Sequence, residues 1–272
     1  FIFCLGGGLG MTDLEIARSV DHKHIFEVAQ ALGIHSEDLI PFGRYKAKIS
    51  LNFAERVKNR PCGRYILVTA INPTPLGEGK TTTSVGLSMA LCRLGHRAAV
   101  TLRQPSLGPV FGIKGGGTGG GRAQVWPMED INLHFTGDAH AVSASHNLLS
   151  AFVDNHLFHG NALKLDPQRI RWPRTLGVSD RALRDIVLSA EGKPRPGQFV
   201  ITEASEIMAV LALATDHADL RQRLGRILVG LTESGAMTMA EAFGCAGSMA
   251  VLLKDALLPN LVQTLEGTPA FV

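Results

Sequence analysis

The chain has 272 residues, enough for one large α/β domain or for one domain with a smaller unit. Apolar residues make up 45% of the chain, which is ample for a buried core. A formal net charge of only +3, without a long run of Lys or Arg, argues against a nucleic-acid partner. No apolar run reaches the roughly 20 residues that a membrane-spanning helix needs, so we expect no membrane partner either.

The four cysteines, Cys4, Cys62, Cys92 and Cys245, are widely spaced. No two of them have the CxxC spacing, so they do not suggest a zinc site. We expect free thiols in a reducing cytosol, and therefore a cytoplasmic protein.

The first ten residues, FIFCLGGGLG, are apolar and Gly-rich, and they lack the charged region that begins a signal peptide. Met11 follows them, and then Thr12 and Glu15 have the spacing of a helix capping box. We interpret residues 1–10 as a non-native or disordered extension and 11–272 as the folded nucleotide-binding domain. A tail that packs into the core is the alternative.

The elements expected along the chain begin with a helical segment over residues 12–35, stopped by Gly33. A β-rich run at 65–70, a helix at 81–94 and a second buried strand at 98–102 then form a βαβ unit. This order predicts an α/β fold with a parallel sheet flanked by helices, similar to P-loop NTPases. Further on, we expect helices at 147–158, 204–214, 219–223 and 245–258, strands at 199–202, 227–231 and 260–265, and loops at 166–180 and 191–197.

A phosphate-binding loop lies between the first strand and the helix of that unit. It comprises Thr74, Pro75, Leu76, Gly77, Glu78, Gly79, Lys80 and Thr81. The residues match the pattern G-x-x-x-x-G-K-[ST], except that Thr74 takes the first position. Small residues let backbone N–H groups surround phosphate oxygens, and the next helix directs its positive end at them. Lys80 would then reach the β- and γ-phosphates, and the Thr81 hydroxyl would hold Mg²⁺. An ordinary Gly-containing turn is the alternative.

Two features follow the second strand. Arg103 stands at the carboxyl end of that strand, where ligands bind in open parallel sheets. A cation there could clamp a phosphoryl or acyl-phosphate group, although a surface arginine is the alternative. The Gly-rich stretch 112–121, with Lys114, could wrap an anion closely, and its alternative is a flexible linker.

Residues 130–140 hold two acids and two histidines, and His146 follows. This composition is compatible with metal binding, and with acid–base chemistry by Asp138 or His140. Polar loop residues without a catalytic role are the alternative.

Taken together, these segments resemble formate–tetrahydrofolate ligase. The matching pieces are MTDLEIARSV at 11–20, FGRYKAKISL at 42–51, TPLGEGKTT at 74–82, LRQPSLGPVFGIKGG at 102–116, DINLHFTGDAHA at 130–141, ASEIMAVLALATD at 204–216, LRQRLGRILV at 220–229 and LLPNLVQTLEGTPAFV at 257–272. The likeness runs almost continuously from Met11 to Val272 and covers roughly the N-terminal half of the family's length. Such long, ordered matches are far more specific than a phosphate loop alone.

The resemblance implies an enzyme that uses ATP to join formate to tetrahydrofolate, giving 10-formyltetrahydrofolate, ADP and phosphate by way of formyl phosphate. It assigns nucleotide binding to residues 74–81, phosphate binding to Lys80 and Arg103, and a catalytic-site role to Asp138. It also implies a monovalent cation and a homotetramer, while the expectation of Mg²⁺ comes from the loop pattern.

Some positions depart from the family pattern. The family has KGGAAGGGY where this chain has Gly117, Thr118 and Arg122, and FDIT where this chain has Val200. The family's second half, which supplies much of the folate and adenine sites, has no counterpart here. A P-loop ATPase or nucleotide switch, or an inactive fragment of the ligase, therefore remain alternatives. We expect poor turnover by the isolated chain and an exposed apolar face near 245–272.

Overall fold

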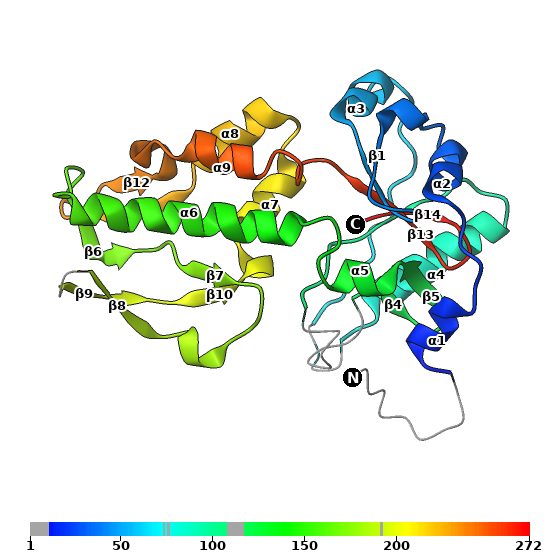
Figure 1. Cartoon of the computed structure of the whole chain (residues 1–272), viewed down its shortest axis with the longest axis horizontal. Coiled ribbons are helices and arrows are strands. Elements are labelled where there is room, and N and C mark those ends of the chain that lie inside the picture. Colours follow the sequence, from blue (N-terminus) through cyan, green and yellow to red (C-terminus); the bar gives the residue numbers. More distant parts are fainter. Residues whose placement is uncertain (1–10, 73, 75–76, 108–116, 191–192) are drawn as a thin grey trace. The chain divides into compact units, whose positions relative to one another are not determined.

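The computed structural model describes residues 11–72, 74, 77–107, 117–190 and 193–272. The expectations for residues 1–10, Pro75, Leu76 and Lys114 lie outside this part of the chain. The chain divides into two compact units. Unit 1 holds the described residues up to Thr136 together with Leu258–Val272, and unit 2 is Gly137–Leu257 (Figure 1).

Unit 1 is built on a mixed sheet. Its strands are β1 (Leu39–Pro41), β2 (Ala47–Ile49), β3 (Val100–Thr101), β4 (Gly119–Gly120), β5 (Ala123–Trp126), β13 (Asn260–Thr264) and β14 (Pro269–Phe271). The order is β1-β2-β13-β14-β3, and β5 pairs with both β13 and β4. Among these described strands the β14–β3 pair is parallel, while the other pairs are antiparallel. The fold of this unit is therefore mixed α/β.

The capping box predicted at the start of the first helix of unit 1 is confirmed. The helices of the unit are α1 (Asp13–Arg18), α2 (Ile25–Ala31), α3 (Leu51–Val57), α4 (Lys80–Arg93) and α5 (Met128–Asn132), and a 3₁₀ turn, η1, spans Ser36–Asp38. The Thr12 N–H donates to the Glu15 carboxylate at 2.7 Å, and the Glu15 N–H donates back to the Thr12 hydroxyl at 3.3 Å. These bonds lower the pKa of Glu15. The single helix expected over 12–35 is wrong, because residues 19–24 separate α1 from α2.

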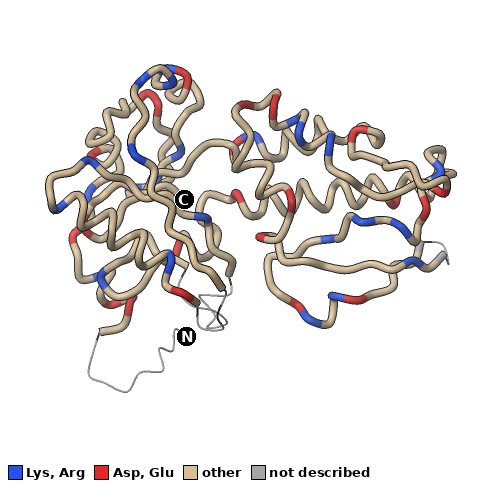
Figure 2. Tube along the Cα trace, turned by 180° about the vertical axis from the view of Figure 1, so that it is seen from behind, with Lys and Arg blue, Asp and Glu red and all other residues tan. Residues whose placement is uncertain are grey.

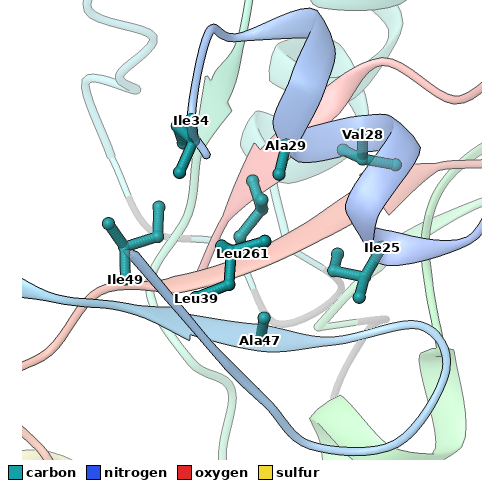
Figure 3. Packing of buried hydrophobic residues seen from close by; sticks show 8 residues of the cluster. All are labelled: Ile25, Val28, Ala29, Ile34, Leu39, Ala47, Ile49 and Leu261. Atoms are coloured by element: carbon teal, nitrogen blue, oxygen red, sulfur yellow. The ribbon is translucent and has the colours of Figure 1, made fainter. Parts of the chain in front are cut away.

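Helices cover both faces of the unit 1 sheet because neighbouring residues of β13 point to opposite sides. Leu261 packs with Ile25, Val28 and Ala29 of α2 in one buried cluster (Figure 3). Val262, the next residue, belongs to a second cluster with residues of α4 and α5. Every residue of β13 is accordingly buried, and this strand is the centre of the unit's core.

The prediction of a strand at residues 65–70 is wrong. Residues 61–70 have no regular secondary structure, and Tyr65, Ile66 and Leu67 are exposed. The second strand of the expected βαβ unit is present but short, since β3 takes only two of the residues 98–102. The helix between them forms as predicted. α4 spans Lys80–Arg93, and Gly95, whose φ is +83°, follows its C-cap.

Unit 2 contains a long helix, α6 (Asp138–Phe158), which packs against α9 (Ala246–Leu252) and β7 (Arg174–Leu176) (Figure 1). Its other elements are β6 (Leu165–Ile170), β8 (Ile186–Ala190), β9 (Lys193–Gly197), β10 (Phe199–Ile201), α7 (Glu206–Leu213), α8 (His217–Gly225), β11 (Leu228–Thr232) and β12 (Met237–Met239), with 3₁₀ turns η3 (Arg181–Leu183), η4 (Thr202–Ala204) and η5 (Ala240–Phe243). β12, β11 and β6 form one small sheet, β10 and β7 a parallel pair, and β8 and β9 a hairpin. The loops expected at 166–180 and 191–197 are therefore wrong, since they contain β6, β7 and β9.

The prediction of an exposed apolar face near residues 245–272 is mostly wrong. Val251 and Leu252 are exposed, but β13 is buried throughout, and Ala270 of β14 is fully buried. Basic and acidic side chains are interspersed along both units, in line with the small net charge (Figure 2). In the described part of the chain no helix is long and apolar enough to cross a membrane.

Candidate phosphate-binding site

The candidate site is built on α4, which is held against the sheet by one face. Val85, Ser88 and Met89 are buried, at the spacing of three and four residues that places side chains on one side of a helix. Val85 and Met89 pack in the cluster that contains Val262. The opposite face is in solvent, and so is the first residue of the helix, Lys80. The core contacts of α4 therefore fix the position of its first residue, Lys80.

Two glycines give the loop its backbone path. Gly77 has φ of +87° and Gly79 has φ of +72°, in the left-handed region that favours glycine. Apart from the adjoining residues, no atom of the described part of the chain lies within 4 Å of where a Cβ would be at either position, so the requirement for glycine is conformational rather than steric. Gly79 is the N-cap of α4 and offers no side-chain cap. The first N–H groups of a helix without such a cap are available to an anion.

Glu78 already brings a negative charge to this loop. Its carboxylate accepts a hydrogen bond from the Thr74 backbone N–H and forms an ion pair with the Lys80 ammonium group. The Lys80 ammonium, followed by the Thr74 N–H, lowers the pKa of Glu78 to about 2. The two donors that the loop would direct at a phosphate therefore engage an oxyanion of the protein itself.

Thr81 and Arg103 lie in the same unit as this ion pair. Thr81 is in the first turn of α4 and is half-buried. Arg103 is exposed and follows β3, the strand that α4 contacts. The Leu102 N–H donates to the Phe271 carbonyl at 2.8 Å, which ties the start of the Arg103 segment to β14. Lys80 and Arg103 thus belong to neighbouring elements of one unit, and a phosphate ligand shared by them stays a prediction.

The described part of the Gly-rich stretch is packed rather than free. A Cβ on Gly117 would lie 2.2 Å from Cβ of Pro105, and one on Gly119 would lie 2.0 Å from the Ala123 carbonyl oxygen. The Gly121 N–H donates to the Asp13 carboxylate at 2.8 Å. A flexible linker does not describe residues 117–121, and residues 112–116 lie outside the described part of the chain.

Residues 130–140 are divided between the two units. Asp130 pairs with the Lys46 ammonium at 2.6 Å, and the same ammonium donates to the Phe135 carbonyl at 2.8 Å. Asp138 and His140 begin α6 in unit 2, so the approach of Asp138 to the phosphate loop stays a prediction. Among the described residues no group of three or more His, Cys, Asp or Glu side chains could hold a metal ion.

His146 has a structural role. Its Nε2 lies 2.9 Å from the Pro173 carbonyl oxygen, and its Nδ1 lies 2.8 Å from the Ser205 hydroxyl. Because the carbonyl can only accept, Nε2 donates, and Nδ1 of the neutral ring accepts from Ser205. The ring also stacks on Trp172 with centroids 4.0 Å apart. Burial lowers the pKa of His146 to about 4, so the neutral form is strongly favoured.

Sequence reasoning missed two roles. The sequence places Glu78 in the loop but does not indicate its ion pair with Lys80, although the spacing of two residues allows it. The sequence gives no local signal for Lys46, because its contact Phe135 lies 89 residues away in the sequence. A local pattern could have suggested the first role, whereas the second depends on the folded unit.

Comparison with known proteins relates the chain to one family. It matches the sequence model described as formate–tetrahydrofolate ligase over residues 11–272. It is 57% identical to the formate–tetrahydrofolate ligase of Thermosipho africanus over 265 residues, which are 96% of this chain and 48% of that protein. The formate–tetrahydrofolate ligase of Roseiflexus sp. is 56% identical over 266 residues, which are 96% of this chain and 47% of that protein.

The formate–tetrahydrofolate ligase of Cereibacter sphaeroides is 57% identical over 265 residues, again 96% of this chain and 48% of that protein. The chain thus spans about half the length of the curated relatives it matches. Because the family match covers residues 11–272 almost without remainder, the chain belongs to the formate–tetrahydrofolate ligase family.

Proposed function

We propose that this chain supplies the nucleotide-phosphate-binding part of an ATP-dependent formate–tetrahydrofolate ligase. The observation that carries the proposal is the start of α4, where the Thr74 N–H and the Lys80 ammonium together hold a carboxylate. Donors that hold one oxyanion suit another, and the left-handed Gly77 and Gly79 open the backbone to it. These residues therefore fit the phosphates of ATP.

The proposed reaction has two steps. A formate oxygen bonds to the γ-phosphorus of ATP while ADP leaves, which gives formyl phosphate. The amine of tetrahydrofolate then bonds to the formyl carbon and gives up its proton while phosphate leaves, which gives 10-formyltetrahydrofolate. Formate is a poor electrophile, and phosphorylation provides the leaving group that the second step needs. The protein's task is to position the anions and to stabilise the charge that moves between them.

We assign the roles within this reaction as follows. Lys80 holds the β- and γ-phosphates, and Arg103 clamps the phosphoryl group as it is transferred. Thr81 is the residue that would hold Mg²⁺, which neutralises phosphate charge when it is bound. We also assign a catalytic-site role to Asp138, the first residue of α6.

The broader assignments rest on the family alone. We propose a P-loop NTPase-like parallel sheet as the complete form of unit 1, with residues 11–272 as the nucleotide-binding part of the enzyme. A homotetramer in the cytoplasm and a bound monovalent cation are proposed on the same ground.

The test is ATP binding by Lys80→Ala, measured by calorimetry in the presence of Mg²⁺. We expect the affinity to fall by about 100-fold, since charge-assisted bonds to two phosphates are lost. Lys58→Ala is the matched control, because Lys58 follows α3 and pairs on the surface with Glu55. Unchanged ATP affinity in Lys80→Ala would contradict the loop assignment.

A coupled assay separates the ligase from the alternatives. ADP release that requires both formate and tetrahydrofolate supports the ligase. ATP hydrolysis that is indifferent to both supports a P-loop ATPase or nucleotide switch. Intact ATP binding without turnover supports an incomplete ligase.

A further inference from the structure

Unit 2 contains a cavity of about 500 Å³. All the residues that line it belong to this unit, and none of them is a residue assigned above to ATP or to the transferred phosphoryl group. A volume of this size is within the range of small-molecule sites. We call it the unit 2 cavity, and its lining indicates the chemistry of a ligand.

One wall of the unit 2 cavity is fixed by hydrogen bonds. The Trp172 indole N–H donates to the His146 carbonyl at 3.1 Å, and the two rings are stacked. The backbone N–H groups of Arg171 and Trp172 both donate to the Val229 carbonyl, at 2.8 and 3.1 Å, which ties this wall to β11. A side chain that is already fixed loses little conformational freedom when a ligand packs against it. This wall is therefore formed before any ligand arrives.

Another part of the lining is apolar and reached by water. Leu228 and Leu231 of β11 contribute to it, together with Met237 of β12, which lies opposite Leu231 in the antiparallel pair. Leu228 is 37% exposed and Met237 is 68% exposed. Covering apolar surface of this kind is favourable, and a methionine side chain adapts to different shapes. This part of the cavity suits a ligand with an apolar body.

The lining also carries two opposite charges. Arg171 and Glu206 both line the cavity, but within the described part of the chain neither side chain forms a hydrogen bond or an ion pair. Two other arginines of unit 2, Arg174 and Arg195, instead share the carboxylate of Asp154. Burial raises the pKa of Glu206, as expected for a carboxyl group that no cation compensates. Each of the two charges is thus available to a ligand.

We propose that the unit 2 cavity binds a small zwitterion with an apolar body, which is the chemistry of a free apolar or aromatic amino acid. The ligand carboxylate accepts from the Arg171 guanidinium, whose forked donors suit both carboxylate oxygens. The ligand ammonium donates to Glu206, and the ligand side chain packs against Leu231 and Met237. A simple anion would leave Glu206 unpaired and a simple cation would leave Arg171 unpaired, so the charge pattern favours a ligand that carries both charges.

The first experiment titrates phenylalanine into the purified chain. Calorimetry measures binding, and tryptophan fluorescence gives a second signal because Trp172 lines the cavity. We expect a dissociation constant of about 0.1–1 mM, in keeping with the small size of the ligand. Glycine has the same charges without the apolar body, and it should bind at least about 30-fold more weakly.

Two substitutions and two analogues assign the charges. Arg171→Gln and Glu206→Gln should each weaken phenylalanine binding by about 10-fold, since each removes one charge-assisted interaction. Phenylpropionate lacks the ammonium group, so its affinity should not fall with Glu206→Gln. Phenylethylamine lacks the carboxylate, so its affinity should not fall with Arg171→Gln.

Arg169→Gln is the matched control. Arg169 is an exposed residue of β6, two positions before Arg171, and it is not part of the cavity lining. The substitution makes the same change of charge and should leave phenylalanine binding unchanged. If circular dichroism shows that Arg171→Gln disturbs the fold, Arg171→Lys replaces it. That variant keeps the charge but not the fork, and the affinity should fall by about 3-fold.

Three results would overturn the proposal. One is the absence of binding up to about 10 mM phenylalanine. Another is phenylpropionate or phenylethylamine binding as tightly as phenylalanine, which would remove the case for a zwitterion. The third is an affinity that neither Arg171→Gln nor Glu206→Gln changes. None of these measurements uses ATP, so the Lys80→Ala experiment remains a separate test of the proposed function.

Discussion

The start of α4 and the centre of α6 both gather polar groups, but they differ in how those groups are satisfied. At the start of α4, Glu78 and Lys80 pair in a position where the lysine side chain is 45% exposed. In α6, both nitrogens of His146 are bonded, and the ring is buried against Trp172.

This difference separates a binding site from a structural one. A ligand oxyanion can take the place of the Glu78 carboxylate at Lys80, because the lysine side chain is 45% exposed and keeps an anionic partner throughout the exchange. No ligand can replace the partners of His146 without leaving Ser205 or the Pro173 carbonyl unsatisfied in the interior. We therefore expect substitutions at the two places to change different quantities.

The largest effect is expected from His146→Ala. It removes two hydrogen bonds and a stacked ring from the interior of unit 2, so the free energy of unfolding should fall by about 3 kcal/mol. Urea unfolding followed by tryptophan fluorescence measures this loss, since Trp172 contacts the ring. ATP affinity of the protein that remains folded should be unchanged. Normal stability together with weakened ATP binding would contradict a structural role for His146 and would indicate a role in binding instead.

A second effect follows from the low pKa of His146. In the unfolded chain the ring has a pKa near 6.5, and burial in the folded chain lowers it to about 4. Between these values the unfolded chain binds the proton more readily, so stability is present above pH 6.5 and is lost as pH falls toward 4.

From pH 7.5 to pH 5 this histidine should account for a loss of about 2 kcal/mol. The measurement compares urea unfolding at both pH values for the wild type and for His146→Gln, which does not titrate in this range. An equal pH dependence in both proteins would show that other groups cause it.

Features that depend on neighbouring residues were predictable from the sequence. The capping box of Thr12 and Glu15 forms within one turn. α4 and its end at Gly95 follow from a local pattern of apolar spacing and a glycine stop. The same is true of Lys80, whose place at the start of α4 is set by the loop pattern around it.

Features that depend on distant pairing were not predictable. β9 contains Pro194 and Pro196, which usually argue against a strand. It forms in a hairpin with β8, and its other edge has no partner among the described strands, so the missing N–H groups cost little. The prediction of a strand at 65–70 is wrong for the opposite reason. Its composition favours a strand, but composition alone does not form a strand when the side chains are left exposed. The partners of His146 lie 27 and 59 residues away, beyond any local pattern.

The smallest and most discriminating effect is expected from Glu78→Gln. The amide oxygen can still accept from the Thr74 N–H, but the neutral side chain no longer competes with phosphate for Lys80. ATP should bind more tightly, by about 3- to 5-fold, in keeping with the modest strength of exposed ion pairs. The gain should shrink as salt is raised, because salt screens the wild-type ion pair.

Calorimetry with Mg²⁺ and ATP at two salt concentrations measures this difference, and Glu55→Gln is the control, since Glu55 pairs with Lys58 on the surface. Weaker ATP binding by Glu78→Gln would mean that the carboxylate takes a direct part in the nucleotide complex. The ion pair at the start of α4 would then be a fixed part of the site, as the bonds of His146 are fixed in unit 2. A tighter complex would instead establish Glu78 as an internal anion that ATP displaces.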